Sequence, residues 1–203
     1  MRRRRPCRRP RTARAARPAQ ALEECFDVVQ WVGRSGEQQG WDAERISTGG
    51  SSAGGNLTLG VLELARRNGG PQVQACALFI PFVDASIPSE TYTGKAFVNP
   101  ALVRTVRDTY FTDESQLVDP LASPALGTVE GLSPLLVISA GLDSLRPHIE
   151  GYVAKATAGG VAVTYRCIED VDYDFPLSNS RALRPQQREM TGLLCEHLLQ
   201  RLA

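Results

Sequence analysis

The segment that most constrains this chain is Arg45–Leu57, which reads Arg-Ile-Ser-Thr-Gly-Gly-Ser-Ser-Ala-Gly-Gly-Asn-Leu. Within it, residues 50–54 fit the pattern Gly-x-Ser-x-Gly, with Ser52 at the centre. This pattern is typical of a sharp strand-to-helix turn that exposes a nucleophilic serine. Glycine tolerates the close backbone approach that we expect two positions before and two positions after the serine. A plain Gly/Ser loop also fits the pentapeptide, so the rest of the chain must decide between the two interpretations.

The rest of the chain alternates between helical and strand patterns. Apolar residues recur at helical spacing before the serine segment, at Leu22, Cys25, Phe26, Val29 and Val32. Further helices are expected over residues 53–67, 100–110 and 146–158 and at the C-terminus. Strands are expected before Ser52 and at residues 73–83, 135–140 and 161–165. This alternation predicts an α/β fold with a mainly parallel sheet flanked by helices.

Charge is distributed unevenly along the chain. Residues 1–20 contain nine arginines and no acidic residue, which leaves 14 basic against 22 acidic residues afterwards, a net charge of −8. Residues 1–18 are expected to form a disordered tail because they have little to bury. Two alternatives stay open: a basic arm that associates with nucleic acid, which the acidic body disfavours, and a misread frame in G/C-rich DNA.

The five cysteines are Cys7, Cys25, Cys76, Cys167 and Cys195. They are widely spaced and include no Cys-x-x-Cys pair, which favours free thiols in a reducing compartment over disulfides or a zinc site. We therefore expect a cytoplasmic protein without metal or cofactor. The longest apolar run, residues 75–83, is too short to span a bilayer.

Several motifs together resemble one known family. Ala21–Cys25 is similar to the helix that precedes the nucleophile strand in the hormone-sensitive-lipase-like α/β-hydrolases, and Gly49–Leu57 resembles the family's Gly-Gly-Asp-Ser-Ala-Gly-Gly-Asn-Leu. Asp119–Pro124 is similar to the segment after the family's cap. Leu135–Leu145 ends in Gly-Leu-Asp-Ser-Leu, like the strand and loop that hold the catalytic acid. The resemblance extends from about Pro18 to the C-terminus.

The resemblance implies a partial α/β-hydrolase fold over residues 19–203. Within it, the length and irregular pattern of the segment at about 85–132 predict a cap-like or lid-like insertion. The resemblance also implies a serine carboxylesterase or lipase-like hydrolase of short or medium acyl esters. Ser52 would be the nucleophile, Asp143 the orienting acid, and the N–H of Ala53 a donor in the oxyanion hole.

The chain departs from the family pattern where the histidine of the catalytic triad should be. Tyr173-Asp174-Phe175 stands where the family has a His-Gly-Phe-like tripeptide. A tyrosine has a pKa of about 10, so near neutral pH it offers no base for the serine proton. His197 lies on the apolar face of the last predicted helix and is interpreted as a packing residue. His148 follows Asp143 closely and is kept as a substitute base, although packing is the favoured interpretation for it as well.

A second departure lies upstream. The family's His-Gly-Gly motif, which supplies oxyanion donors, and about four strands are expected before Ala21, where this chain has the arginine-rich segment. We therefore expect an N-terminally truncated domain with an incomplete catalytic triad. The strand before Ser52 would form an exposed edge through which copies could associate. The rival hypothesis is a non-catalytic relic, or acyl-binding pseudoenzyme, that keeps the pocket without the chemistry.

Overall fold

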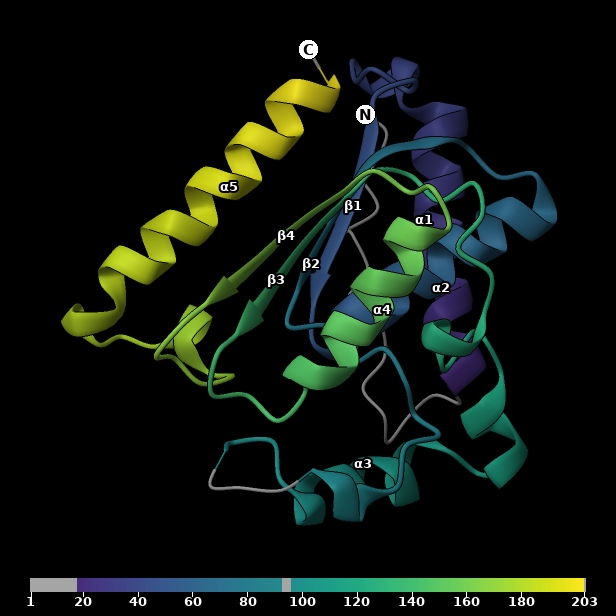
Figure 1. Ribbon diagram of the computed structural model, residues 1–203. Helices are drawn as coiled ribbons and strands as arrows, with labels where there is room; N and C mark the ends of the chain where they lie inside the picture. The colour runs from purple at the N-terminus through teal and green to yellow at the C-terminus, as the bar shows by residue number, and fades with distance from the viewer. Residues whose placement is uncertain (1–17, 93–95, 203) are drawn as a thin grey trace, which may run out of the picture.

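A computed structural model describes residues 18–92 and 96–202. These residues form a four-stranded sheet in which every neighbouring pair is parallel (Figure 1). The spatial order equals the chain order: β1 (Ile46–Ser51), β2 (Val73–Phe79), β3 (Leu135–Ala140) and β4 (Val163–Ile168). The predicted α/β class with a parallel sheet is confirmed.

Helices cover both faces of this sheet. The longer helices are α1 (Pro18–Ser35), α2 (Ala53–Asn68), α3 (Pro100–Tyr110), α4 (Arg146–Ala158) and α5 (Arg184–Leu202). In Figure 1, α5 lies on one face, and α2 and α4 lie on the other. Short 3₁₀ helices occupy Glu37–Gln39, Ser89–Thr91, Glu114–Val118, Pro124–Leu126, Phe175–Leu177 and Arg181–Leu183.

The core is centred on β3. All six of its residues are buried, as expected for a parallel strand covered on both faces. Leu135, Leu136, Val137 and Ile138 each have 0% exposure. Complete burial of an aliphatic side chain of this size contributes about 1.5–3 kcal/mol, so this strand anchors the sheet.

The apolar run at residues 73–83 is a strand only over its first part. β2 ends at Phe79, and Ile80 has a φ of +47°, which turns the chain out of the sheet. The N–H of Ile80 donates to the carbonyl of Ile138 at 2.7 Å. Pro81 and Val83 are buried after this turn. The apolar run at residues 73–83 therefore correctly indicated buried residues, but the strand predicted from it continues past the end of β2 at Phe79.

The segment between β2 and β3 carries α3 and three of the 3₁₀ helices. Figure 1 places α3 on the side of the sheet toward which the strand arrowheads point. The predicted insertion at about 85–132 falls in this segment, and its role as a cap stays a prediction. At the other end of the domain, α1 begins at Pro18, one residue inside the predicted tail. The remainder of that tail lies outside the described residues, as does Cys7.

Within residues 18–92 and 96–202, no helix is long and apolar enough to cross a membrane. The same residues contain no group of three or more His, Cys, Asp or Glu side chains arranged to hold a metal ion.

Candidate active site

The turn after β1 has the geometry expected of a strained nucleophile turn. Ser52 has φ 55° and ψ −117°, an uncommon conformation for a residue with a side chain. Its N–H donates to the carbonyl of Phe79 at 2.9 Å. Its carbonyl accepts hydrogen bonds from the N–H groups of Asn56 at 3.1 Å and Phe82 at 3.2 Å. These contacts fix the strained backbone from both sides.

The glycines around Ser52 differ in what they allow. A Cβ atom added to Gly50 would lie 2.2 Å from the carbonyl oxygen of Gly54, so a side chain is excluded there. A Cβ atom added to Gly54 would meet no atom within 4 Å. The expectation of close approach two positions after the serine is therefore wrong. The crowded position is Gly55, where a Cβ atom would lie 2.8 Å from the Cβ atom of Pro81.

Ser52 occupies the N-cap position of α2. Its side chain makes no capping hydrogen bond, and the residue is only partly exposed. Ala53 is the first residue of α2, so its N–H has no carbonyl in a preceding helical turn to bind. The helix dipole favours negative charge at this point. These features suit an oxyanion donor at Ala53, and that role stays a prediction.

Asp143 follows β3 and is buried, with 4% of its surface exposed. Its Oδ1 accepts a hydrogen bond from the N–H of Leu145 at 3.1 Å. Its Oδ2 is buried and has no hydrogen-bond partner among residues 18–92 and 96–202. The pKa of Asp143 is raised to about 6, mainly by burial and to a smaller extent by the nearby carboxylate of Asp172, and the backbone N–H groups partly oppose this rise. Among the described residues, the carboxyl group of Asp143 is therefore hydrogen-bonded through Oδ1 and not through Oδ2.

Ser52 and Asp143 follow the C-terminal ends of two strands in one parallel sheet, as predicted. β2 lies between β1 and β3, so the two strands are about 10 Å apart at the usual strand spacing. A proton relay between the two side chains therefore needs a third group that bridges β2.

Tyr173, the residue at the predicted histidine position, lies in the loop after β4. Its ring stacks on that of Phe97, with centroids 5.1 Å apart and planes inclined by 3°. The Asp172 carboxylate joins the two backbones, because it accepts from the N–H of Tyr173 at 2.7 Å and from the N–H of Phe97 at 2.9 Å. In the described part of the chain, no hydrogen bond links Tyr173 to Ser52 or Asp143. Its occupation of the histidine site stays a prediction.

Neither histidine completes the site. The ring of His148, on α4, packs 5.1 Å from that of Tyr92, and burial lowers its pKa although Asp84 acts in the opposite direction. His197 is buried on α5, and burial and Arg201 lower its pKa. Among residues 18–92 and 96–202, neither ring is hydrogen-bonded to Ser52 or Asp143. The hydrogen bonds of the described residues therefore identify no base that links the predicted nucleophile to the predicted acid.

Known proteins resemble this chain in sequence and in fold. A family model described as the alpha/beta hydrolase fold matches residues 11–177. Carboxylesterase NlhH of Mycobacterium tuberculosis is 33% identical over 153 residues, which are 70% of this chain and 47% of that protein. The ethyl acetate hydrolase of Pseudomonas putida is 32% identical over 162 residues, covering 76% of this chain and 50% of that protein. The chain thus spans about half the length of the curated relatives that it matches.

Solved structures of esterases have a similar fold. The thermostable esterase from Pseudomonas putida ECU1011 superposes with a TM-score of 0.81 and 30% identity, over 90% of this chain and 60% of the esterase. Carboxyl esterase 2 of the fungus Tuber melanosporum superposes with a TM-score of 0.84 over 91% of this chain and 63% of that enzyme. Its sequence identity is 21%, so it supports the fold alone. The chain belongs to the α/β-hydrolase fold family, in its hormone-sensitive-lipase-like branch.

Proposed function

We propose that this chain carries the site of a serine carboxylesterase, lipase-like in type, for short or medium acyl esters, with impaired turnover. Ser52 is the nucleophile in this proposal, Asp143 is the acid, and the N–H of Ala53 is an oxyanion donor. The names of the relatives, carboxylesterase and ethyl acetate hydrolase, support the ester class.

The observation that carries the proposal is the conformation of Ser52. A non-glycine residue at φ 55° costs free energy, and such strain persists mainly where function requires it. The strain places the serine between the C-terminal end of β1 and the N-terminal end of α2, where a developing oxyanion is favoured.

The impairment follows from the proton that Ser52 must lose. A serine hydroxyl attacks an ester carbon at useful speed only when a nearby base takes its proton. Tyr173 stands at the predicted histidine position, and a phenol does not supply the basic nitrogen that takes this proton in a serine triad. Asp143 follows a strand two positions away in the sheet and is too distant to act directly. Ser52 is therefore expected to behave much like an ordinary alcohol.

Hydrolysis of p-nitrophenyl acetate by the wild type and by Ser52→Ala tests the proposal. We expect the wild-type turnover to lie within about tenfold of that of the variant. Serine hydrolases that lose one triad member but keep a full oxyanion hole retain a rate about 10³-fold to 10⁴-fold above that in water, and removing a second member lowers this rate little further. Labelling of Ser52 by a fluorophosphonate should be correspondingly slow. Rapid turnover and labelling that both disappear in Ser52→Ala would contradict the impairment and would reveal a base not identified above.

A second candidate is an acyl-binding protein without catalysis, and it is favoured by the Oδ2 of Asp143, which has no partner in the part of the chain that the structure describes. In a working triad that oxygen would accept a hydrogen bond from the histidine. Titration with a non-hydrolysable phosphonate ester separates the candidates: saturable, reversible binding without turnover supports the acyl-binding protein, and covalent loss of Ser52 reactivity supports the esterase.

A further inference from the structure

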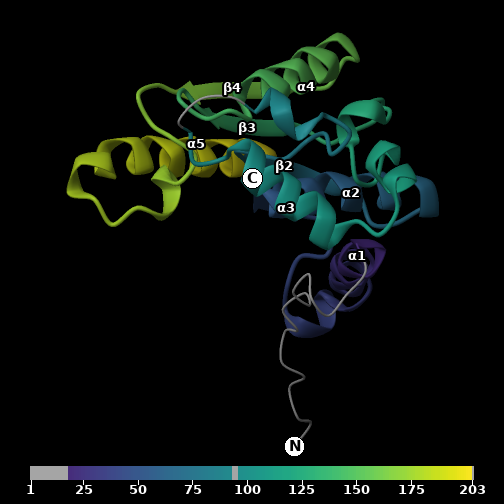
Figure 2. The ribbon, with the colours of Figure 1, turned by 90° about the horizontal axis from the view of Figure 1, so that it is seen from below.

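His197 is the one fully buried side chain of α5, the helix that packs on β2 and β3. Figures 1 and 2 show α5 lying along one face of the sheet. Only 5% of the surface of His197 is exposed. Met190, Leu193 and Leu194 pack against the same core but are only partly buried. The attachment of α5 to the sheet is therefore centred on a histidine.

The surroundings of the His197 ring favour its neutral form. The Nε2 atom is buried and has no hydrogen-bond partner among residues 18–92 and 96–202. Burial and the positive charge of Arg201, one turn further along α5, lower the pKa of His197. The backbone carbonyls of Pro134 and Cys76 oppose this lowering to a smaller extent. A proton added to the ring would therefore be held near a cation and largely out of water.

Within the described residues, the elements that pack most closely on α5 supply no carboxylate to balance such a proton. β2 reads Val-Gln-Ala-Cys-Ala-Leu-Phe and β3 reads Leu-Leu-Val-Ile-Ser-Ala, so neither strand has a charged side chain. Burial raises the pKa of the Cys76 thiol to about 12, so this group also stays neutral. The two 3₁₀ helices before α5 contribute only the cation Arg181. On α5 itself, Glu189 is bound to Arg166 at 2.6 Å, and Glu196 is exposed.

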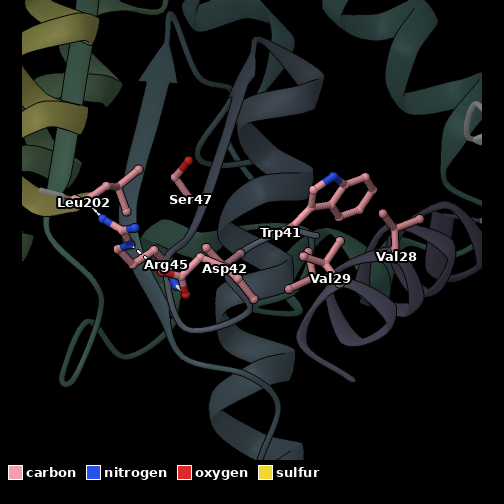
Figure 3. Close-up of a pocket in the computed structure, with 9 residues that line it drawn as sticks. Val28, Val29, Trp41, Asp42, Arg45, Ser47 and Leu202 are labelled. Carbon is pink, nitrogen blue, oxygen red and sulfur yellow. Dashed lines mark hydrogen bonds and ion pairs between the residues drawn. The ribbon is translucent and has the colours of Figure 1, made fainter. Parts of the chain in front are cut away.

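Side-chain hydrogen bonds hold α5 near its two ends. In its first turns, the Gln187 side chain donates to two carbonyls of the preceding segment at 2.9 Å and 2.8 Å. At its last residue, the Leu202 carbonyl accepts a hydrogen bond from Arg45 at 2.6 Å (Figure 3). This second bond is exposed, and exposed polar contacts contribute little to stability. The C-terminal half of α5 therefore combines one exposed hydrogen bond with the buried ring of His197.

We infer that α5 is an acid-sensitive cover of the sheet, which protonation of His197 releases from β2 and β3. Water solvates the charged ring once the helix has left, whereas the docked position offers no compensating anion among the groups named above. The pKa of His197 is lower in the docked state than its ordinary value of about 6.5. The stabilisation that the neutral ring contributes is therefore fully present above about pH 6.5 and is lost as the pH falls below it.

Amide hydrogen exchange of the full chain at pH 5, 6, 7 and 8, corrected for the intrinsic exchange rate at each pH, measures the release. We expect the protection of the α5 amides to fall by about tenfold from pH 8 to pH 5. The largest change that a group with an ordinary pKa of about 6.5 allows over this range is about 30-fold. The amides of β3 should keep their protection within about threefold, because the strand stays in the sheet when only the helix leaves.

Three variants sharpen the test. His197→Gln and His197→Leu both remove the titrating group, the first with a polar and the second with an apolar side chain. In both, the protection of α5 should change by less than about threefold between pH 8 and pH 5. His148→Gln removes the chain's other histidine and serves as the matched control. It should keep the tenfold loss of the wild type.

Equal protection of α5 at pH 5 and pH 8 in the wild type would overturn the inference. A tenfold loss that persists in whichever His197 variant folds would overturn it as well, since another group would then be titrating. A parallel loss in α5 and β3 would show that acid unfolds the domain as a whole, which contradicts release of the helix alone.

Discussion

A Cβ atom on Gly50 would lie 2.2 Å from the carbonyl oxygen of Gly54, whereas a Cβ atom on Gly54 would meet no atom within 4 Å. The two glycines flank Ser52 symmetrically in sequence, but only the first is required by packing. Gly50 faces the first turn of α2, whereas an added methyl group on Gly54 points away from neighbouring atoms.

We therefore predict opposite effects for Gly50→Ala and Gly54→Ala. The first should destabilise the fold by more than about 3 kcal/mol, because backbone atoms must move to admit the methyl group. The second should be neutral or stabilising by up to about 1 kcal/mol, because alanine is the better helix residue. Urea unfolding followed by circular dichroism measures both, and a similar loss at the two positions would contradict the geometry.

Asn56 joins α2 to two other segments. Its side-chain Nδ2 donates to the carbonyls of Phe82 and Ala122, both at 2.8 Å. Asn56→Asp turns this donor into a charged acceptor facing two carbonyls and should cost about 2–5 kcal/mol of unfolding free energy. Asn179→Asp, at an exposed loop position, should change it by less than about 0.5 kcal/mol. Equal stabilities of the two variants would show that the paired hydrogen bonds contribute little.

Asp143 should make stability depend on pH in an unusual direction. Its pKa is raised to about 6 in the folded protein, against about 3.9 in an unfolded chain, so the folded state holds the proton more tightly. The stability that this group contributes is present below pH 4 and is lost as the pH rises to about 6, by at most about 3 kcal/mol.

Asp143→Asn removes this loss. Relative to the wild type, the variant should therefore gain up to about 3 kcal/mol between pH 4 and pH 7 in urea unfolding. Asp108→Asn, at an exposed carboxylate of α3, serves as the matched control and should show no comparable trend. A wild-type-minus-variant difference that stays constant with pH would mean that Asp143 is ionised throughout.

Tyr173→His should restore little esterase activity, less than about tenfold over the wild type. Ala53 supplies the oxyanion donor in the proposed site, and each further donor is typically worth about 10² to 10³ in rate, so we expect that returning the base alone leaves the oxyanion poorly held. The ring of Tyr173 also stacks on that of Phe97, in the segment before α3, and this contact helps to fix where the side chain of residue 173 lies. Hydrolysis of p-nitrophenyl acetate by Tyr173→His, with Tyr173→Phe as control, measures the gain. A large gain in rate whose pH dependence has a midpoint near pH 6–7 would show that the wild type lacks only the histidine.

The sequence predicted the regular elements well, because their determinants are local. The helix starting at Pro100 has asparagine as its cap and proline in its first turn, and both signals are visible in the sequence. The strand at Leu135–Ala140 was visible as a continuous apolar run between polar segments. The end of β2 was missed because Ile80 and Pro81 are buried and apolar like the strand residues before them.

The features missed at the site depend on contacts between distant segments. Nothing in the local sequence around Ser52 distinguishes Gly54 from Gly55, since the crowding at Gly55 comes from Pro81 after the next strand. The stacking of Phe97 on Tyr173 joins residues from two loops. That the Oδ2 of Asp143 has no partner among the described residues could not be predicted, because it depends on every group around this oxygen. The order Ser52 then Asp143, by contrast, was readable from the two strands that precede them.

The order of the strands has a consequence for how the domain folds. Each strand pairs with the strand that precedes it in the sequence. One long helix connects β1 to β2, and another connects β3 to β4. Each of these two βαβ units closes a short loop and should form early. β2 and β3 are separated by the long segment that carries α3, so their pairing closes the longest loop. We expect that pairing to limit the folding rate, with two half-sheets as the transient species before it.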